Sequence, residues 1–240
     1  MKVVVVTGAT RGLGFAICEK LLREGYRIVA VARNSNESFS ALLEQFPEQL
    51  FFHAFDFTNL DGIHQLAKEI AEKYGRIYGL VNNAAIGSDG VLATMHDNDI
   101  GHLLSVNVQA PIILTKYLIR PMLMNQQGRV INVSSIIAET GYSGLSVYGA
   151  SKAALVGFTK SLAREVGKAK ITVNAIAPGF MRTQMTGELD DEKLASIARR
   201  SALKSLISCD DVAQGVSYLL SSGASSVTGT TLTIDAGSTA

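Results

Sequence analysis

The sequence has little of several features that mark common protein classes. Cysteine occurs only twice, at Cys18 and Cys209, which is too sparse for a disulfide framework and favours free thiols in a reducing compartment. No uninterrupted run of about 18 apolar residues is present, so we expect no membrane span. No separate apolar stretch with a cleavage site follows Met1 and Lys2, so we expect no signal peptide and a cytoplasmic location. The net charge of +1 favours neither a nucleic-acid nor a membrane partner.

Residue patterns for hydrolysis or metal binding are also missing. A hydrolase nucleophile commonly lies in G-x-S-x-G, and the nearest approach, GLSVY at 144–148, lacks the final glycine. His96 and His102 do not show a recognised metal spacing, and none of the four histidines has an evident catalytic partner. We therefore expect no metal site and do not favour a hydrolase.

What the chain does contain is an alternation of short apolar runs and longer helical patterns. The runs are rich in Val, Ile and Phe, and several are apolar on both faces, which suits parallel strands covered by helices on both sides. The expected strands are Lys2–Thr7, Arg27–Ala32, Leu50–Phe55, Ile77–Asn82, Arg129–Ser134, Ile171–Ala177 and Thr230–Asp235. The expected helices include Leu13–Glu24, Gly62–Tyr74, Ser146–Val166 and Asp210–Leu220. This pattern predicts a doubly wound, Rossmann-like α/β fold with a mostly parallel seven-stranded sheet.

The domain organisation follows from the same pass along the chain. Residues 1–240 show no repeat and no obvious linker, so we expect a single domain. Its most irregular segment, residues 180–208, is polar, charged and long for a connection. Long connections are commonly functional lids, so we expect a substrate lid here, with a solvated helical insertion as the alternative.

A glycine-rich turn, TGATRGLG at 7–14, follows the first expected strand and opens a helix. Glycine lets the chain turn tightly and lets a ligand approach the backbone, and a helix N-terminus attracts phosphate. The spacing G-x-x-x-G-x-G differs from G-x-G-x-x-G, and no Lys-Ser/Thr follows as in a nucleoside triphosphate loop. The turn predicts a pyrophosphate cradle, and a glycine-rich turn without a ligand is the alternative.

The end of the second strand, RIVAVARNSN, indicates which dinucleotide the cradle takes. An acidic residue there favours NAD, whereas an arginine accommodates the 2′-phosphate of NADP. This strand ends in Ala32, Arg33 and Asn34, without a carboxylate, and Arg11 lies in the glycine turn. Two guanidinium groups at one place suit a phosphate dianion, so we expect NADP. Two solvated surface arginines are the alternative.

The segment SVYGASKAALVGF carries candidate proton-transfer residues. Tyr148 and Lys152 are four residues apart and share a helix face. A nearby ammonium lowers the pKa of a phenol, which makes the tyrosine an acid or base near neutral pH. Ser134 and Ser135 end the fifth expected strand, where a hydroxyl can hydrogen-bond a carbonyl oxygen. Asn107 lies in an otherwise apolar helix, and its amide is either functional or a satisfied core group.

Taken in order along the chain, these motifs resemble those of the short-chain dehydrogenase/reductase family. The matching stretches are TGATRGLG at 7–14, DFT at 56–58, NNAA at 82–85, Asn107, VSS at 133–135, YGASK at 148–152, NAIAPGFMRT at 174–183 and IDAG at 234–237. The resemblance implies a catalytic set of Asn107, Ser135, Tyr148 and Lys152. It favours Ser135 over Ser134 because the family's serine lies thirteen residues before its tyrosine. One departure is Ala85, where the usual motif has glycine.

The same resemblance implies how a cofactor is held. Asp56 would contact the adenine, Asn82 would line the cofactor cleft, and Thr183 would hold the nicotinamide carboxamide. The full expected cofactor set is Gly8, Thr10, Arg11, Gly12, Leu13, Gly14, Arg33, Asp56, Phe57, Asn82, Ala84, Tyr148, Lys152, Pro178, Gly179, Met181 and Thr183. The carboxyl ends of the first six expected strands carry, at the end or just beyond it, Gly8, Arg33, Asp56, Asn82, Ser135 and Pro178. This edge is where open α/β sheets bind ligands.

Within the family the chain is most similar to the 3-oxoacyl-acyl-carrier-protein reductases, chiefly through NNAAIGSDGVLATM and ITVNAIAPGF. This implies reduction of 3-oxoacyl thioesters in fatty acid biosynthesis, with an acidic acyl carrier protein as a possible partner. The group's basic residues before the fifth strand are replaced by NQQ at 125–127. A smaller basic patch is one interpretation of Arg164, Lys168 and Lys170, and a solvated helix end is the alternative. A carbonyl reductase of other ketones and a non-catalytic nucleotide sensor remain alternatives.

Assembly is indicated by two helices that are apolar on more than one face. They contain NVQAPIILTK and KAALVGF, and a helix that is apolar beyond one stripe needs burial on a second side. In the family that the chain resembles, these helices form the main subunit contact of a tetramer. We therefore expect a homotetramer.

Overall fold

The apolar runs form one seven-stranded sheet in the computed structural model of the chain, which describes residues 1–87, 89–181 and 191–240. All neighbouring strands are parallel, in the order β3-β2-β1-β4-β5-β6-β7. The strands are β1 (Val3–Thr7), β2 (Arg27–Ala32), β3 (Leu50–Ala54), β4 (Ile77–Asn82), β5 (Gly128–Val133), β6 (Ile171–Pro178) and β7 (Thr231–Ile234). The mostly parallel sheet expected from the sequence is confirmed, and each strand ends within one residue of its expected bounds.

Helices occupy the connections between the strands. They are α1 (Gly12–Arg23), α2 (Glu37–Gln45), α3 (Ile63–Tyr74), α4 (Asp97–Leu104), α5 (Ala110–Asn125), α6 (Ile137–Thr140), α7 (Ser146–Val166), α8 (Asp191–Arg200) and α9 (Cys209–Leu220). A π-helical turn, Ser105–Gln109, joins α4 to α5 without a break in the helical backbone. Helix α8 lies within the expected lid at 180–208, of which residues 182–190 lie outside the described chain.

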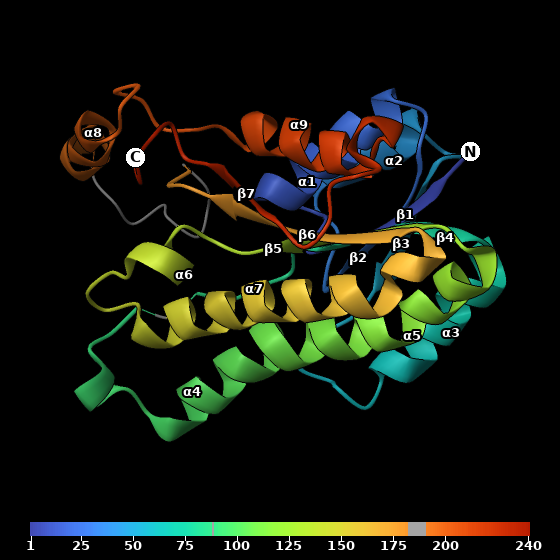
Figure 1. The fold of residues 1–240 in the computed structure, drawn as a ribbon, viewed down its shortest axis with the longest axis horizontal. Helices are drawn as coiled ribbons and strands as arrows, with labels where there is room; N and C mark the ends of the chain where they lie inside the picture. Colours follow the sequence, from blue (N-terminus) through green and yellow to red (C-terminus); the bar gives the residue numbers. More distant parts are fainter. Residues whose placement is uncertain (88, 182–190) are drawn as a thin grey trace.

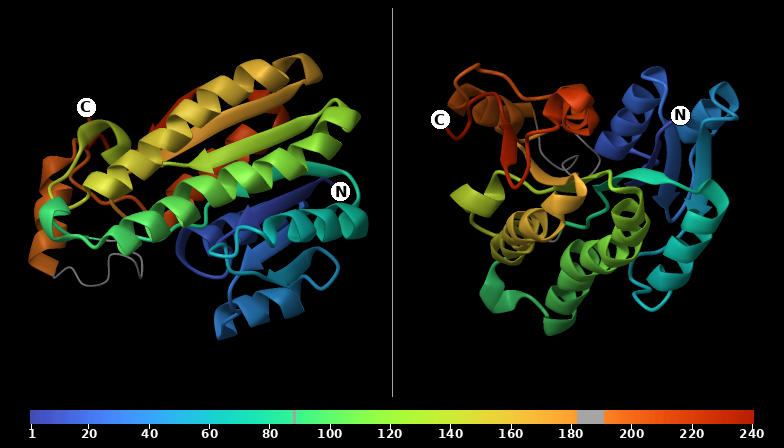
Figure 2. Two further views of the ribbon diagram at one scale, coloured as in Figure 1. Left: turned by 90° about the horizontal axis from the view of Figure 1, so that it is seen from below. Right: turned by 45° about the vertical axis from the view of Figure 1, so that its right-hand side comes forward.

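The sheet is the middle of three layers. Helices α1, α2 and α9 cover one face, and α3, α5 and α7 cover the other (Figures 1 and 2). The four valines of β1 explain why both faces are covered, because successive strand residues point to opposite faces. Val4 and Val6 pack with the first set of helices, and Val3 and Val5 pack with the second. Each buried valine contributes roughly 1.5–3 kcal/mol to this arrangement.

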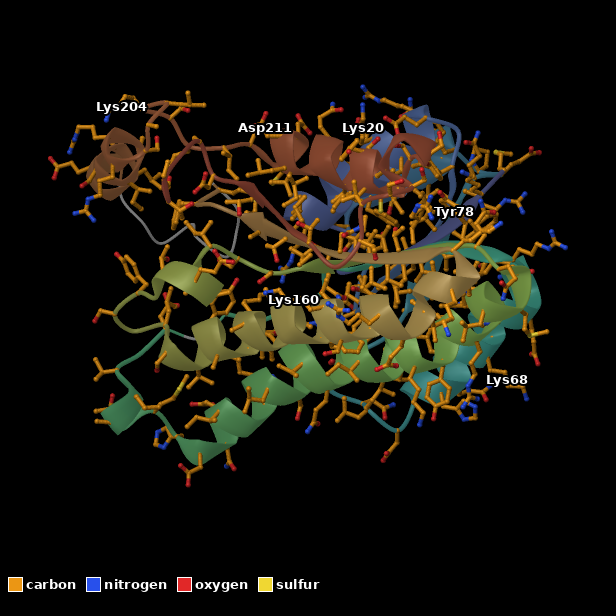
Figure 3. The ribbon with its side chains drawn as sticks, in the orientation of Figure 1. Lys20, Lys68, Tyr78, Lys160, Lys204 and Asp211 are labelled. Carbon is orange, nitrogen blue, oxygen red and sulfur yellow. The ribbon has the colours of Figure 1, made fainter. Side chains whose placement is uncertain are left out.

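Tyr78 shows how a polar group is accommodated between two layers. Its ring is buried on β4, and its hydroxyl donates a 2.6 Å hydrogen bond to the Leu220 carbonyl at the end of α9 (Figure 3). The ammonium of Lys2 lies 4.1 Å from the centre of the ring. A buried tyrosine needs such a partner for its hydroxyl, and here that partner joins α9 to the sheet.

The strand order determines where a ligand can bind. Strand β1 lies between β2 and β4. The strands β2 and β3 are therefore added on one side of β1, and the strands from β4 onwards are added on its other side. Open α/β sheets bind ligands beyond the carboxyl ends of their strands where the strand order reverses in this way. The loops after β1 to β6 all emerge at this edge because the strands are parallel, and the loop after β5 leads into α6, at the left of Figure 1.

Candidate active site

The glycine turn after β1 packs too tightly for side chains. Gly8 has φ +65°, and a Cβ there would lie 2.9 Å from the Cα of Ala84. A Cβ on Gly14 would overlap the Gly8 carbonyl oxygen. Helix α1 begins at Gly12, and the side chain of its N-cap residue, Arg11, makes no capping hydrogen bond. The Arg11 side chain therefore does not occupy the first amides of α1, which point to the place where a pyrophosphate cradle would hold its anion.

Thr7 and Asn83 hold this turn against the end of β4. The Thr7 hydroxyl donates to the Val81 carbonyl and accepts from the backbone amides of Asn83 and Ala84, both at 2.9 Å. The Asn83 amide donates to the carbonyls of Thr7 at 2.9 Å and Gly8 at 3.2 Å. Asn83 therefore supports the cradle, although only its two neighbours, Asn82 and Ala84, were expected at the cofactor site. The available signal was its position directly after a strand end.

Asn82 does not line the cleft with its side chain, contrary to the role that the resemblance implied. It is 3% exposed, and its amide donates to the Thr115 hydroxyl at 3.0 Å and to Asn132 Oδ1 at 2.8 Å. Asn132 in turn donates to the Thr159 hydroxyl at 2.8 Å. These hydrogen bonds join β4, β5, α5 and α7 inside the protein. Asn82 can take part in them because it is the last residue of a strand that is buried along its whole length.

Arg33 and Asp56 follow two neighbouring strands, β2 and β3, and both side chains are exposed. The Thr58 amide donates to Asp56 Oδ1 at 3.0 Å and lowers the pKa of that carboxyl most strongly, and the charge of Arg33 lowers it further. Arg11 is exposed in the glycine turn on the other side of β2. The expected adenine and 2′-phosphate residues are therefore on one rim of the sheet.

Asn36 joins the two sides of this rim. Its amide nitrogen donates to the Thr10 carbonyl at 2.6 Å, and its Oδ1 accepts from the Phe39 amide at 2.9 Å as the N-cap of α2. One side chain thus connects the glycine turn to the start of α2. Asn36 was not predicted as a site residue, although an asparagine before a helical segment is a preferred N-cap.

Two expected cofactor residues have buried side chains. Leu13 is 8% exposed and packs among the core residues of the α1 face, while Phe57 is 7% exposed and packs on the opposite face. Most of each side chain is therefore packed in the core, although Phe57 also lines a small cavity beside Thr7 and Ala84 at this edge.

Tyr148 and Ser135 come together at the carboxyl edge of β5. Tyr148 lies in the first turn of α7, and Ser135 directly follows the end of β5. Burial raises the pKa of the Tyr148 phenol, a hydrogen bond with Ser135 lowers it, and the charge of Asp89 raises it, with a net shift upward. This differs from the sequence-based expectation of a lowered pKa, because burial disfavours the phenolate more than its neighbours favour it.

Lys152 lies one helical turn after Tyr148 and is buried without a carboxylate partner among the described residues. Its Nζ lies 5.6 Å from the centre of the Tyr148 ring and donates to the Val133 carbonyl at 2.9 Å. Burial lowers the pKa of its ammonium to about 8. The ammonium is therefore close to the phenol, and a single carbonyl of β5 fixes its position.

Asn107 lies at the centre of the π-helical turn and is 1% exposed. Its Oδ1 accepts from the Ile86 amide, and its Nδ2 donates to the Ile86 carbonyl, both at 2.9 Å. The same nitrogen donates to the Ser151 hydroxyl at 3.2 Å. The Asn107 side chain is thus committed to the loop after β4 and to α7.

The far side of the edge is formed by the end of β6. Pro178 is buried and its carbonyl accepts from the Ile136 amide, while the Gly179 amide donates to the Ile234 carbonyl. Met181 pairs with Ile207 in an isolated parallel bridge. Thr183, the expected partner of a nicotinamide carboxamide, lies outside the described residues.

The structure also bears on three further features of the sequence: the alanine at position 85, the expected lack of a metal site, and the expected lack of a membrane-spanning helix. Ala85 is half-buried and is not among the four non-glycine residues with positive φ, so its extra methyl causes no backbone strain of that kind. Across 1–87, 89–181 and 191–240, no group of three metal-ligating side chains occurs. No helix in this part of the chain is long and apolar enough to span a membrane.

Comparisons with known proteins agree with this arrangement. A family profile described as "short chain dehydrogenase" matches residues 2–194. The 3-oxoacyl-[acyl-carrier-protein] reductase FabG of Haemophilus influenzae is 38% identical over 238 residues, covering 98% of this chain and 97% of that protein. Carbonyl reductase family member 4 of Xenopus laevis is 36% identical over 236 residues, with 98% and 97% covered.

Solved structures show the same fold and similar coverage. An actinorhodin polyketide ketoreductase variant solved with NADPH superimposes with a TM-score of 0.92 at 30% identity, covering 99% of this chain and 97% of that one. The protein ElxO, solved with NADP bound, gives a TM-score of 0.90 at 28% identity, with 99% and 98% covered. The profile match over most of the chain and the full-length relatives lead to one conclusion: the chain belongs to the short-chain dehydrogenase/reductase family of oxidoreductases.

Proposed function

We propose that this chain is an NADP(H)-dependent reductase that converts the ketone of a 3-oxoacyl thioester to an alcohol, with Tyr148 as the proton donor. One observation carries the proposal. The Tyr148 phenol is close enough to the Ser135 hydroxyl for that group to lower its pKa, and it lies beside the buried Lys152 ammonium at the sheet edge that also carries the glycine cradle.

The residues at this edge fit the cofactor. The close contacts of Gly8 and Gly14 and the first amides of α1 suit a pyrophosphate. Arg11 and Arg33 would hold the 2′-phosphate, and Asp56 would contact the adenine. When bound, the reduced cofactor supplies the hydride. The NADPH- and NADP-bound structural relatives support this choice of cofactor.

The Tyr148 phenol carries the proton that reduction requires. With its pKa above the ordinary value it is fully protonated at neutral pH, so its hydroxyl can give a proton to a carbonyl oxygen, and the positive charge of Lys152 would favour that transfer. The Ser135 hydroxyl donates a hydrogen bond to the same oxygen. The nearby Lys152 ammonium then stabilises the phenolate that remains.

The mouth of the site favours a substrate with an apolar arm. The Gly90 amide donates to the Gly144 carbonyl at 3.0 Å, which brings two segments together next to Tyr148. These segments carry three exposed apolar side chains, Val91, Leu92 and Tyr142. An acyl chain covers such side chains, whereas a small polar ketone leaves them in water. The FabG relatives support the same substrate class.

A small-ketone reductase is the second candidate. Carbonyl reductase family member 4 of Xenopus laevis matches this chain over the same length and at nearly the same identity as the FabG proteins. In that case the apolar rim would have no acyl chain to bind, and diketones, quinones or cyclic ketones would be the better substrates.

The basic residues expected from the sequence to dock a carrier protein do not lie near the catalytic residues of the same chain. Residues 125–127, Lys168 and Lys170 precede β5 and β6, so they lie at the amino edge of the sheet, opposite the catalytic residues. A six-residue strand spans about 20 Å, so this basic patch is not near the cleft of the same chain. The exposed Arg199 and Arg200 lie in the last turn of α8, and the exposed Lys204 follows that helix. Lys204 is beside α8, at the same end of the molecule as α6 (Figures 1 and 3). We therefore place carrier docking at α8, and we expect little salt dependence with small free thioesters.

The test is NADPH oxidation with four probes: acetoacetyl-N-acetylcysteamine, 2,3-butanedione, a quinone and a cyclic ketone. The highest kcat/KM with the thioester is expected, and a thioester that is not reduced while butanedione is reduced rapidly would leave the carbonyl reductase. Tyr148→Phe should lower kcat by about 10²–10⁴-fold with the best probe, because it removes the proton donor. NADPH binding should be nearly unchanged, and a variant with substantial activity would contradict the role of Tyr148.

A further inference from the structure

Two buried serines bind the backbone of the catalytic pair. The Ser151 hydroxyl donates to the Tyr148 carbonyl at 2.7 Å, and the Ser134 hydroxyl donates to the Lys152 carbonyl at 3.0 Å. Ser151 is 0% exposed and Ser134 is 3% exposed, so neither hydroxyl exchanges these partners for water. Ser134 holds α7 from the sheet, whereas Ser151 belongs to α7 itself and bonds back to the carbonyl three residues earlier, in the first turn of the helix.

Ser151 is the link between α7 and the π-helical turn. It accepts a hydrogen bond from Asn107 Nδ2 at 3.2 Å while donating to the Tyr148 carbonyl. The other interactions of the Asn107 amide are with the Ile86 backbone. One hydroxyl therefore connects the loop after β4, the long helix of α4 and α5, and the residue that gives the proton.

The Ser151 hydroxyl is placed to fix the position of the first turn of α7, and it is not placed to take part in proton or hydride transfer. Ser151 is completely buried and has both its donor and its acceptor function occupied, so it does not touch a substrate or a cofactor. Without its hydroxyl, the buried Asn107 Nδ2 loses an acceptor and the Tyr148 carbonyl loses a donor. The first turn of α7 is then free to shift relative to Ser135 and Asn107.

We propose that Ser151 is a positioning residue, which sets the distance between the Tyr148 phenol and the Ser135 hydroxyl by tying the first turn of α7 to Asn107. The proposal rests on Tyr148 as the proton donor but does not depend on which ketone is reduced. A misplacement of about 1 Å at a reacting group reduces turnover by up to about a hundredfold, so a small shift of α7 has a large effect.

The chain offers a matched control on the same helix. Thr159 is 0% exposed, and its hydroxyl accepts from the Asn132 amide at 2.8 Å. Ser151→Ala and Thr159→Val each remove a buried hydroxyl on α7 that accepts from an asparagine. Only the Ser151 hydroxyl also donates to the backbone carbonyl of Tyr148.

The test compares kcat, KM, NADPH affinity, melting temperature and the pH profile of kcat for both variants and the parent. The probe is acetoacetyl-N-acetylcysteamine, or 2,3-butanedione if the parent reduces only the diketone. A failed thioester assay therefore overturns the proposed substrate and leaves this test intact. Ser151→Ala should lower kcat by about ten- to a hundredfold, with little change in KM or NADPH affinity.

The pH profile separates positioning from stability. The Ser135 hydrogen bond lowers the pKa of Tyr148, while the charge of Asp89 raises it and Lys152 lies one turn away. If the phenol moves away from Ser135, the alkaline limb of the Ser151→Ala profile shifts to higher pH. Thr159→Val should lower the melting temperature but keep the parental kcat and pH profile.

Two results would overturn the proposal. One is a Ser151→Ala enzyme with parental kcat and an unshifted pH profile. The other is a loss of kcat in both variants that follows their loss of melting temperature, which would make Ser151 merely structural. If Ser151→Ala does not fold, Ser151→Cys replaces it, because a thiol keeps a weak donor and acceptor and predicts an intermediate kcat with a smaller shift of the limb.

Discussion

At the scale of single residues, the buried Lys152 ammonium is a source of instability that the site retains. Within the described residues its ammonium donates to the Val133 carbonyl and has no carboxylate partner, and burial lowers its pKa from 10.5 to about 8. The unfolded chain therefore binds a proton more readily between these two pH values. The unfavourable contribution of Lys152 is fully present below pH 8 and disappears as the pH rises towards 10.5.

This sign leads to a prediction for Lys152→Met, which removes the charge and nearly keeps the shape. The variant should be more stable than the parent at pH 7, by up to about 3 kcal/mol, and it should lose turnover. The gain should shrink as the pH rises above 8. Urea unfolding at pH 7 and pH 10 measures both points, and a variant that is less stable than the parent at pH 7 would contradict the assignment of Lys152 as a destabilising charge.

Arg33 is the residue whose charge we expect to select the cofactor. The parent should prefer NADPH over NADH by at least about tenfold in kcat/KM, or about 1.4 kcal/mol. Arg33→Asp should erase or reverse this preference, because a carboxylate repels the 2′-phosphate and accepts hydrogen bonds from the ribose hydroxyls of NAD. Steady-state kinetics with both cofactors measures the ratio. If the parent used NADPH and NADH equally well, the proposed binding of the 2′-phosphate by Arg11 and Arg33 would be wrong.

At the scale of elements, the connection between the glycine turn and α2 gives the next prediction. Asn36→Ser keeps an N-cap acceptor for α2 but loses the amide that donates to the Thr10 carbonyl. We expect NADPH to bind about three- to tenfold more weakly, the value of one net hydrogen bond, with NADH affinity little changed. Fluorescence titration with both cofactors measures this, and Asn36→Ala, which loses the cap as well, is the control. An equal loss for both cofactors would indicate a purely structural role.

Elements differ in how well the sequence predicts them. The strands were predictable because residues such as the four valines of β1 are apolar towards both layers, and α7 was predicted with its observed bounds, Ser146–Val166. The π-helical turn was not predictable, because the hydrogen bonds between Asn107 and Ile86 join segments that are distant in sequence. The four-residue α6 has no buried residue and so leaves no apolar pattern.

The same reasoning explains which site residues were found from the sequence. Gly8, Arg33, Ser135 and Tyr148 follow strand ends or lie in a motif, so their position at one edge followed from the topology. Asn82 and Asn83 are adjacent and chemically identical, and only the structure shows that the first points into the core and the second supports the cradle. The net direction of the Tyr148 pKa shift also required the structure, because it depends on how deeply the phenol is buried.

At the scale of the whole molecule, one face of α7 is suited to contact with another copy of the chain. Four small residues on this helix are exposed: Ala150, Ala153, Ala154 and Gly157. Lys160, labelled in Figure 3, follows them one turn later and is also exposed. Small side chains let two helices approach closely, and half-buried Ile112 and Ile113 of α5 extend the apolar character of the same layer. These features support the homotetramer expected from the sequence.

A long charged side chain in the middle of this face tests the assembly. Ala154→Arg should convert the tetramer into a smaller species, because a packed helix contact has no space for a guanidinium group and leaves its charge unpaired. The matched control is Ala41→Arg on the exposed side of α2, which should remain tetrameric. Multi-angle light scattering of the parent and both variants at micromolar concentration measures the mass. A parent that is a stable monomer would remove the assembly, and an Ala154→Arg protein that stays tetrameric would place the contact on another face.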